Sequence, residues 1–358
     1  MSSPANSQKC GNPKCTAATG TAADSASPSS SSSPLQRCSR CQKASYCSRD
    51  CQAAAWPQHK RSCKRPNYII KFHVCPGDVT DPPVTRTLSC PADALFYHLH
   101  MALQVAFQWS TTHSFDFAVA NPDYVLGGND GRDYGSILEH INRLNPNRGP
   151  DPNDPQEYLA RVVDPVEQTM FSGVDRMHEG ARRHLNTVEK KADKYKLYQL
   201  LDDPKYQGKI SPNQLIIGQR KQIIYTYDFG DNWEHHMTIT GRAEAKHQFV
   251  CLDGSGHYIA EDAGGTRGWQ ELKAAYRTTS PNKEQREKRE WFEKFASNSD
   301  PAGLGGDRAA KWDRDQINRD LSNFIERFER MADLNEERMA EMMNGPMAGM
   351  FPGATGGR

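Results

Sequence analysis

Eight side chains that can bind zinc lie within the first 63 residues, as seven cysteines and one histidine. They form four short-spaced pairs, C-x4-C, C-x2-C, C-x3-C and H-x3-C, which are Cys10, Cys15, Cys38, Cys41, Cys47, Cys51, His59 and Cys63. A structural zinc ion takes four nitrogen or sulfur ligands in a tetrahedron, usually from such pairs. Eight ligands therefore predict two closed sites, with no coordination position left for a substrate or water.

Short elements must position these ligands. The C-x3-C and H-x3-C pairs have i,i+4 spacing, which places two side chains on one face of a helical turn. The Ala-Ala-Ala-Trp run favours a helix, and we expect Pro57 to end or restart it. Trp56 is the expected apolar centre of the module. Because so small a core cannot fold alone, zinc must supply on the order of 10–16 kcal/mol per structural site.

The run from Cys38 to Cys63 resembles the MYND zinc finger, with Tyr46 and Gln52 also fitting the pattern. The resemblance implies two interleaved zinc sites, one held by Cys10, Cys15, Cys47 and Cys51 and the other by Cys38, Cys41, His59 and Cys63. The first pair departs from the family because it is C-x4-C where C-x2-C is usual. A Ser/Ala/Thr-rich stretch follows it, and we expect this stretch to be a disordered loop.

The resemblance also implies a protein partner, because MYND fingers mostly bind proteins, often short proline-rich peptides. Such peptides lose little entropy when they dock on an aromatic-lined surface. Four basic residues near the histidine ligand leave nucleic-acid binding as an alternative; they are Lys60, Arg61, Lys64 and Arg65. The basic residues are not interleaved with aromatic side chains for base stacking, so we favour a peptide.

Composition limits the classes of protein to which this chain can belong. The 45 Lys and Arg nearly balance the 44 Asp and Glu, so no global field attracts nucleic acid or membrane. We see no signal peptide and no run of about 18 apolar residues that would span a membrane. Cys75, Cys90 and Cys251 remain outside the zinc pairs, and we expect them to be buried core thiols. The chain is therefore expected in the cytoplasm or nucleus, without a membrane partner.

From residue 66 onward the pattern predicts an α+β domain, a mainly antiparallel sheet with helices on one face. Alternating β-rich runs predict strands at 68–75, 84–88, 113–119, 223–229 and 236–240. Asp93 is expected to cap a helix that follows it. The apolar positions of this helix recur with a 3.6-residue period at Leu95, Leu99, Leu103 and Phe107.

Four motifs in this region resemble the plasmid pRiA open-reading-frame-three-like family, relatives of transposon passenger proteins. They are the Leu-His-x2-Leu-Gln helix from Leu99 to Trp109, His113-x-Phe-x-Phe, Tyr227-Asp-Phe-Gly-Asp-x-Trp-Glu-His235, and the Glu261-Asp-x-Gly-Gly run that leads to Trp269. The resemblance covers about residues 68–278, interrupted at about 129–212. It implies a fold but no established reaction, and a finger joined to such a domain is similar to uncharacterised fungal proteins.

The same motifs supply a candidate ligand site, which comprises Asp228, Asp231, His235, Glu261 and Asp262. Carboxylates and imidazoles can bind a cation or transfer protons. A structural interpretation is also open and is favoured: Asp228 would cap backbone N–H groups of a turn in which Gly230 takes a positive φ. His235 and His236 are adjacent in a strand and point to opposite faces, so at most one joins a given site.

The remaining segments complete the predicted organisation. We expect disorder at 1–9, a finger at 10–63 with a flexible loop at 16–34, and the α+β domain at 66–280 with an insertion at 129–212. A helical extension at 281–343 and a disordered tail at 344–358 follow. Within the insertion, 174–201 is expected to be a charged helix with Glu189, Lys190 and Lys191 in solvent.

Two helices are expected in the extension. The first, at 283–295, has Trp291, Phe292 and Phe295 on its apolar side. The second, at 315–343, carries an apolar stripe made of Ile317, Leu321, Phe324, Phe328, Met331 and Leu334. We favour packing of this stripe on the domain, and a helix for a partner or for self-association is the alternative.

Together these features predict a zinc-binding adaptor or regulatory protein, whose finger recruits a partner and whose second domain has an unassigned role. An enzyme is the less favoured reading. The alternatives are a ligand- or metal-dependent activity in the α+β domain and nucleic-acid binding.

Overall fold

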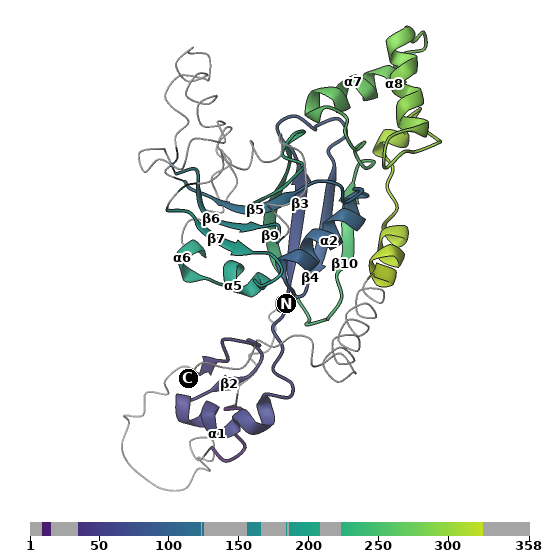
Figure 1. Cartoon of the computed structure of the whole chain (residues 1–358). Helices are drawn as coiled ribbons and strands as arrows, with labels where there is room; N and C mark the ends of the chain where they lie inside the picture. Colours follow the sequence, from purple (N-terminus) through teal and green to yellow (C-terminus); the bar gives the residue numbers. More distant parts are fainter. Residues whose placement is uncertain are drawn as a thin grey trace, which may run out of the picture.

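The computed structural model describes residues 9–15, 35–122, 124, 156–165, 184, 186–207 and 223–324. Figure 1 shows a small N-terminal module beside a larger domain built on one sheet. Disorder is expected at 1–9, 16–34 and 344–358, and all of these positions except residue 9 lie outside the described residues. The stripe beyond residue 324 also lies outside them.

The N-terminal module is a two-stranded antiparallel sheet followed by one helix. Strand β1 (Gln36–Arg37) pairs with β2 (Ser45–Tyr46), and α1 (Arg49–His59) begins three residues later. Ser48 caps α1, since its side chain accepts a hydrogen bond of 3.1 Å from the backbone N–H of Cys51. This cap fixes the start of the helix next to two of the predicted ligands.

Two expectations for this module are wrong. Pro57 lies inside α1 and does not end it, because the N–H of Lys60 still bonds to the carbonyl of Trp56 at 2.9 Å and closes the last turn. Trp56 is 39% exposed and is not the core. Tyr46 and Ala55 fill the centre instead, packed with the buried thiols. Because the cysteine sulfur atoms fill most of the interior of the finger, one tyrosine ring is enough to fill the rest of its core.

The larger domain contains an eight-stranded sheet in the order β10-β4-β3-β9-β8-β5-β6-β7. Every pairing is antiparallel except β6 with β7, which is parallel. The strands are β3 (Asn67–Val74), β4 (Thr85–Cys90), β5 (Phe115–Ala120), β6 (Tyr158–Val163), β7 (Val188–Lys191), β8 (Ile223–Tyr227), β9 (Trp233–Ala243) and β10 (Val250–Ser255). The expected mainly antiparallel sheet is confirmed.

Helices cover the sheet and close one end of it (Figure 1). They are α2 (Phe96–Phe107), α5 (Leu197–Leu201), α6 (Pro204–Gln207), α7 (Gly265–Arg277), α8 (Lys283–Lys294), the short 3-10 helix η2 (Arg308–Ala310) and a helix over residues 314–324. Helix α2 provides the centre of the core, because Leu99, Leu103 and Phe107 are at most 1% exposed. Cys75, Cys90 and Cys251 are buried as expected.

Asp93 does not cap α2. The N-cap is Leu95, whose side chain offers no hydrogen bond. The Asp93 carboxylate instead binds Arg65 at 3.2 Å and lies 3.8 Å from Arg40. Both arginines belong to the N-terminal module or its hinge, so this carboxylate is used to join the two parts of the chain.

The prediction of a charged helix at 174–201 is wrong for most of the part that the structure describes. Val188–Lys191 is the edge strand β7, and only Leu197–Leu201 is helical. Glu189, Lys190 and Lys191 are exposed as expected. Exposed Glu and Lys side chains are equally compatible with an edge strand and with a surface helix. The segment is a strand because it pairs in parallel with β6.

The two C-terminal helices pack on the domain. Phe292 of α8 is fully buried and Trp291 is partly buried, but Phe295 is 71% exposed, so its place on the apolar side is wrong. Ile317 and Leu321 are each 1% exposed and join the main core. Packing of the stripe on the domain is therefore confirmed for these two positions. None of the described helices is long and apolar enough to cross a membrane.

Candidate functional sites

The eight predicted zinc ligands form two clusters. One comprises Cys10, Cys15, Cys47 and Cys51, and the other comprises Cys38, Cys41, His59 and Cys63; within each, all ligand atoms lie within 4.8 Å of one another. The first cluster is brought together partly by the N–H of Gly11, which bonds to the carbonyl of Ser45 in β2 at 2.7 Å. The chain thus crosses between the clusters, as the predicted interleaved order requires.

Distances within the clusters fit zinc. Sulfur atoms around a tetrahedral zinc at about 2.3 Å lie about 3.8 Å apart, and a sulfur and a nitrogen lie slightly closer. The Cys38–Cys63 sulfurs are 3.7 Å apart, and the Cys41 sulfur lies 3.5 Å from Nε2 of His59. The Cys47 sulfur lies 3.4 Å from that of Cys51. A disulfide at about 2.05 Å is excluded, so the two clusters fit two zinc sites.

A third cluster lies on the loops at one end of the sheet and combines one imidazole with three carboxylates. Nε2 of His113 lies 3.0 Å from Oδ1 of Asp262, 3.7 Å from Oδ2 of Asp228 and 3.9 Å from Oε1 of Glu261. We call these four residues the loop cluster. Three loops contribute to it: the one before β5, the β8–β9 turn and the one before α7.

Sheet register positions this cluster. Phe115 at the start of β5 pairs with Tyr227 at the end of β8, and the N–H of Asp228 bonds to the carbonyl of Ser114 at 3.1 Å. The loops that carry His113 and Asp228 therefore run side by side. Asp228 has φ 56°, a left-handed conformation that Asp adopts more readily than most residues.

The β8–β9 turn has the expected Asp chemistry. Oδ1 of Asp228 accepts hydrogen bonds from the N–H groups of Gly230 and Asp231, at 2.9 and 3.2 Å. The positive φ angles fall on Asp228 and Asn232 and not on Gly230, which corrects that part of the expectation. Because only Oδ1 serves the turn, Oδ2 remains directed toward His113.

Glu261 is the most firmly held carboxylate of the loop cluster. Its Oε1 accepts hydrogen bonds from Tyr227 at 2.6 Å and from the Thr112 hydroxyl at 3.2 Å, and Oε2 accepts from the N–H of Ser110 at 2.9 Å. The Glu261 N–H in turn donates to Asn298, at 2.7 Å. These bonds fix the position of a side chain that is only 1% exposed.

Electrostatics shift two members of the loop cluster. Burial alone would lower the pKa of His113, but the neighbouring Asp228, Asp262 and Glu261 outweigh it and raise the pKa above 6.5. Burial raises the pKa of Asp228 above 3.8, against the opposing effects of His113 and two backbone N–H groups. A cation at this position is favoured by the surrounding charge.

The other two predicted site residues lie apart from this cluster. Oδ2 of Asp231 accepts a hydrogen bond from the N–H of Gly264 at 3.0 Å, which ties the turn to the start of α7. His235 is fully buried in the sheet, where Nε2 accepts from the indole of Trp109 at 3.3 Å. His236 points to the opposite side of β9, as expected for adjacent strand residues.

The sequence did not identify three residues as site residues. They are His113 of the loop cluster, and Tyr227 and Asn298, which hydrogen-bond to Glu261. His113 lay in a recognised motif, but nothing in its spacing linked it to Asp228. Tyr227 also lay in a motif and was assigned to the strand alone. Asn298 follows α8 and carried no signal, because its hydrogen bonds to Glu261, Ile259 and Gln108 are all long-range.

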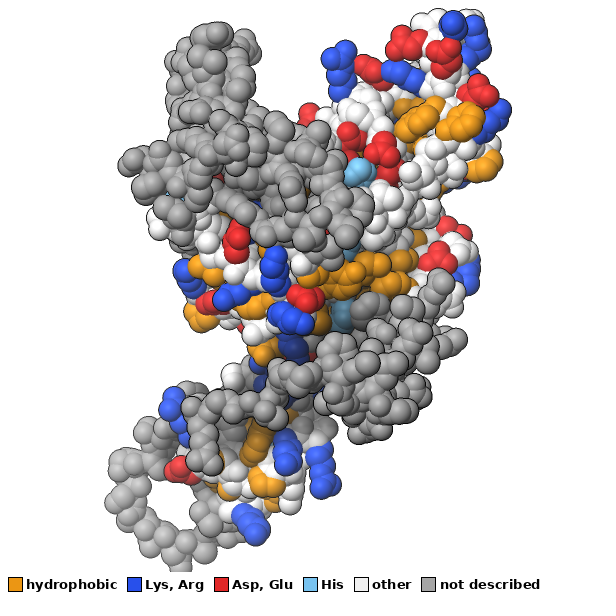
Figure 2. Space-filling model, viewed as in Figure 1, with side chains coloured by type: hydrophobic (Ala, Val, Ile, Leu, Met, Phe, Trp, Pro, Cys, Tyr) orange, Lys and Arg blue, Asp and Glu red, His pale blue; other side chains and the backbone are white. Residues whose placement is uncertain are grey.

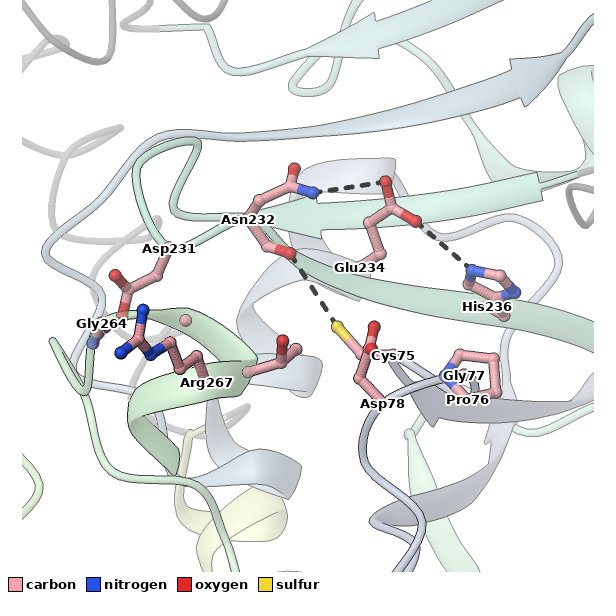
Figure 3. Close-up of a pocket in the computed structure, with 12 residues that line it drawn as sticks. Cys75, Pro76, Gly77, Asp78, Asp231, Asn232, Glu234, His236, Gly264 and Arg267 are labelled. Carbon is pink, nitrogen blue, oxygen red and sulfur yellow. Dashed lines mark hydrogen bonds and ion pairs between the residues drawn. The ribbon is translucent and has the colours of Figure 1, made fainter. Parts of the chain in front are cut away.

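An open pocket of about 520 Å³ lies beside the β8–β9 turn, and Figure 3 shows its lining. The 75–78 loop, the start of β9 and the first turn of α7 enclose it. Glu234 and His236 lie side by side on its wall, 3.4 Å apart. Burial raises the pKa of the Cys75 thiol to about 12, which keeps it protonated at neutral pH.

These observations define a two-part protein, a zinc finger joined to an α+β domain with polar loops. Residues 8–63 match the MYND finger, and residues 76–303 match the family described as Plasmid pRiA4b ORF-3-like protein. The second match covers more than half of the chain, and the chain therefore belongs to the Plasmid pRiA4b ORF-3-like family. Its MYND finger supports a zinc-binding role in protein interaction.

Individual relatives match smaller parts. A stretch of 30 residues is 63% identical to the human histone-lysine N-methyltransferase SMYD3 and covers 8% of this chain and 7% of that protein. A stretch of 102 residues is 34% identical to the uncharacterized protein y4hQ of Sinorhizobium fredii (strain NBRC 101917 / NGR234), covering 26% and 52%. The chain thus spans about half of y4hQ and a small fraction of the methyltransferase.

One solved structure is also similar to this chain. The crystal structure of the protein of unknown function MM3350 from Methanosarcina mazei Go1 aligns with a TM-score of 0.39 and 18% identity. The alignment covers 70% of this chain and 96% of that one.

Proposed function

We propose that this protein is a zinc-dependent adaptor whose finger docks a proline-rich peptide on the exposed face of α1. The exposed ring of Trp56 carries the proposal. It is 39% exposed, while the other large ring of the finger, Tyr46, is 1% exposed. Ala53, Ala54 and Pro57 are also exposed on α1.

The chemistry of this face suits such a peptide. An indole ring held on a rigid helix offers a flat apolar surface to prolines, whose fixed φ limits the entropy lost on docking. The two zinc sites hold α1 at its start through Cys51 and at its end through His59. Docking would therefore depend on metal even though the zinc ions contact no peptide.

Charge indicates the composition of the flanking residues. Residues 9–15 and 35–65 contain ten Lys and Arg but only one acidic residue, Asp50. Figure 2 shows Lys and Arg side chains distributed around the finger at the bottom of the view. An acidic flank next to the prolines would accelerate encounter with this surface. The same charge is the observation in favour of nucleic-acid binding.

Peptide selection against the intact chain, followed by calorimetry on the selected proline-rich peptide, tests the proposal. Trp56→Ala should weaken binding at least tenfold while the zinc content stays at two ions. Phe295→Ala removes an even more exposed ring, at the C-cap of α8, and should leave binding unchanged. Unchanged affinity in Trp56→Ala, or selection of no proline-rich peptide, would reject docking on α1.

Salt dependence separates the two kinds of partner. Nucleic-acid binding through phosphate contacts gives a logarithmic slope of about −0.9 for each phosphate neutralised on a duplex. A peptide docked mainly through prolines should show a shallow slope set by its few acidic residues. A steep slope with a single- or double-stranded oligonucleotide, together with weak peptide binding, would favour the nucleic-acid alternative.

A further inference from the structure

The loop cluster contains more negative charge than its own histidine can neutralise. Asp228, Glu261 and Asp262 are three carboxylates around one imidazole. Within the described part of the chain, no Lys or Arg forms an ion pair with any of them. Side-chain exposure is 6% for Asp228 and 1% for Glu261, so water screens these charges poorly. Buried charge of one sign requires a partner of the other.

Among the described residues, no hydrogen-bond donor contacts one oxygen of Asp228. Oδ1 of Asp228 is used by the turn, whereas Oδ2 has no hydrogen bond to any described residue. Its nearest charged neighbour, Nε2 of His113, is 3.7 Å away, which is beyond hydrogen-bond distance. The Asp228 side chain is 6% exposed, and Oδ2 is the oxygen on the side of His113.

The donor atoms of His113, Asp228 and Asp262 lie close enough together to surround one small cation, all within 4.8 Å of one another. Ligands at about 2.1 Å from an ion lie about 3.0 Å apart at adjacent octahedral positions and about 3.4 Å apart in a tetrahedron. The contacts of His113 with Asp262 and Asp228 are 3.0 and 3.7 Å, the second about 0.3 Å longer than the tetrahedral spacing. Glu261, at 3.9 Å from His113, lies outside this range and is already held by three donors.

We propose that His113, Asp228 and Asp262 bind one divalent first-row metal ion through Nε2, Oδ2 and Oδ1. One imidazole with two carboxylates suits Mn²⁺ or Zn²⁺ and lacks the thiolates that select softer ions. Glu261 acts as a positioning residue that adds negative charge and holds the loop before Asp262. It is in turn fixed by Tyr227 and Asn298.

This site differs from the finger sites in being open. Asp262 has a side chain 54% exposed, and three protein ligands leave coordination positions for water or for an oxygen of a bound ligand. Asp231 connects the β8–β9 turn both to the wall of the 520 Å³ pocket and to the start of α7.

Titration of the intact, zinc-loaded chain with Mn²⁺ alone tests the site, with free Mn²⁺ followed by electron paramagnetic resonance. One Mn²⁺ per chain should bind in addition to the two zinc ions, and it should raise the melting temperature of the α+β domain. The finger sites are already filled and offer sulfur ligands, so they do not compete for this ion.

The variants use two aspartates of one turn. Asp228→Asn keeps the Oδ1 acceptor of the turn but replaces Oδ2, and it should weaken Mn²⁺ binding at least tenfold, as should His113→Gln. Asp231→Asn changes the neighbouring carboxylate, which faces Gly264, and should bind Mn²⁺ like the parent chain. Circular dichroism establishes that each variant is folded.

Two results would overturn the metal site. One is a folded, zinc-loaded parent chain that binds no third ion, whether probed with Mn²⁺ or with Zn²⁺ by native mass spectrometry. The other is equal binding by Asp228→Asn and Asp231→Asn. Neither result bears on peptide docking at Trp56, because the two tests use different modules.

Discussion

The finger and the α+β domain differ in what stabilises their folds. In the finger, the buried apolar cluster consists of three thiols, Tyr46 and Ala55. In the α+β domain, α2 and one face of the eight-stranded sheet contribute to one continuous core. The first region needs metal to exist, while the second has a complete core and is free to place polar side chains on its loops.

This difference explains what each donor set can do. Thiolates held in closed tetrahedra leave nothing for a substrate, so the finger offers only its outer surface. The loop cluster uses oxygen and nitrogen donors on loops held by a folded sheet, and it is partly exposed.

Zinc removal should show the largest contrast. A strong chelator, or the pair Cys38→Ser and Cys41→Ser, should unfold the finger, because a structural zinc contributes on the order of 10–16 kcal/mol. The α+β domain should remain folded, because its core does not depend on the finger. Amide hydrogen exchange, read separately for residues 35–63 and 67–120, distinguishes the two regions.

Cys251→Ala provides the control for zinc removal. It removes a buried thiol outside the finger and should leave two zinc ions bound. Loss of protection in both regions on chelation would mean that the α+β domain relies on the finger, and the comparison would fail.

Truncation in the core of the larger domain should have the next largest effect. Phe292→Ala should reduce its unfolding free energy by about 3–5 kcal/mol, because a fully buried ring leaves a cavity. Phe295→Ala, three residues later and 71% exposed, should change it by less than about 0.5 kcal/mol. Urea denaturation measures both, and equal effects would mean that α8 does not pack through Phe292.

Acid should weaken the α+β domain through two buried histidines. Burial lowers the pKa of His100 and of His235 to about 3, from 6.5 for an exposed histidine. The unfolded chain then takes up protons first, so stability present above pH 6.5 is lost as the pH falls toward 3. At pH 5 each histidine should account for about 2 kcal/mol of loss.

His235→Gln isolates one of these contributions. Glutamine cannot take up the proton and can still accept the Trp109 hydrogen bond. The slope of stability between pH 6.5 and 4.5 should therefore become shallower. His247→Gln, at an exposed position, should leave the slope unchanged. If the unfolding free energy of the parent chain did not change between pH 6.5 and 4.5, His100 and His235 could not be buried in their neutral form.

Zinc ligation was readable from the sequence because the ligands come as short-spaced pairs, and local spacing restricts where two side chains can lie. Strands and the α2 helix were readable for the same reason, since alternation and a 3.6-residue period are local patterns. Helix 174–201 was misassigned because its exposed charges satisfy either a helix or an edge strand. Trp56 was misassigned because composition cannot say whether sulfur or indole fills a small core.

Sequence by itself thus determined the metal-binding finger, the strand pattern and the carboxylate-rich turn. Tertiary structure decided which carboxylates share a site, because His113, Asp228 and Asp262 approach one another only after β5 pairs with β8 and the loop before α7 folds back. It also placed His235 inside the sheet and Asn298 against Glu261. Contacts between residues more than 30 positions apart depend on strand register and core packing, and these are properties of the whole folded chain.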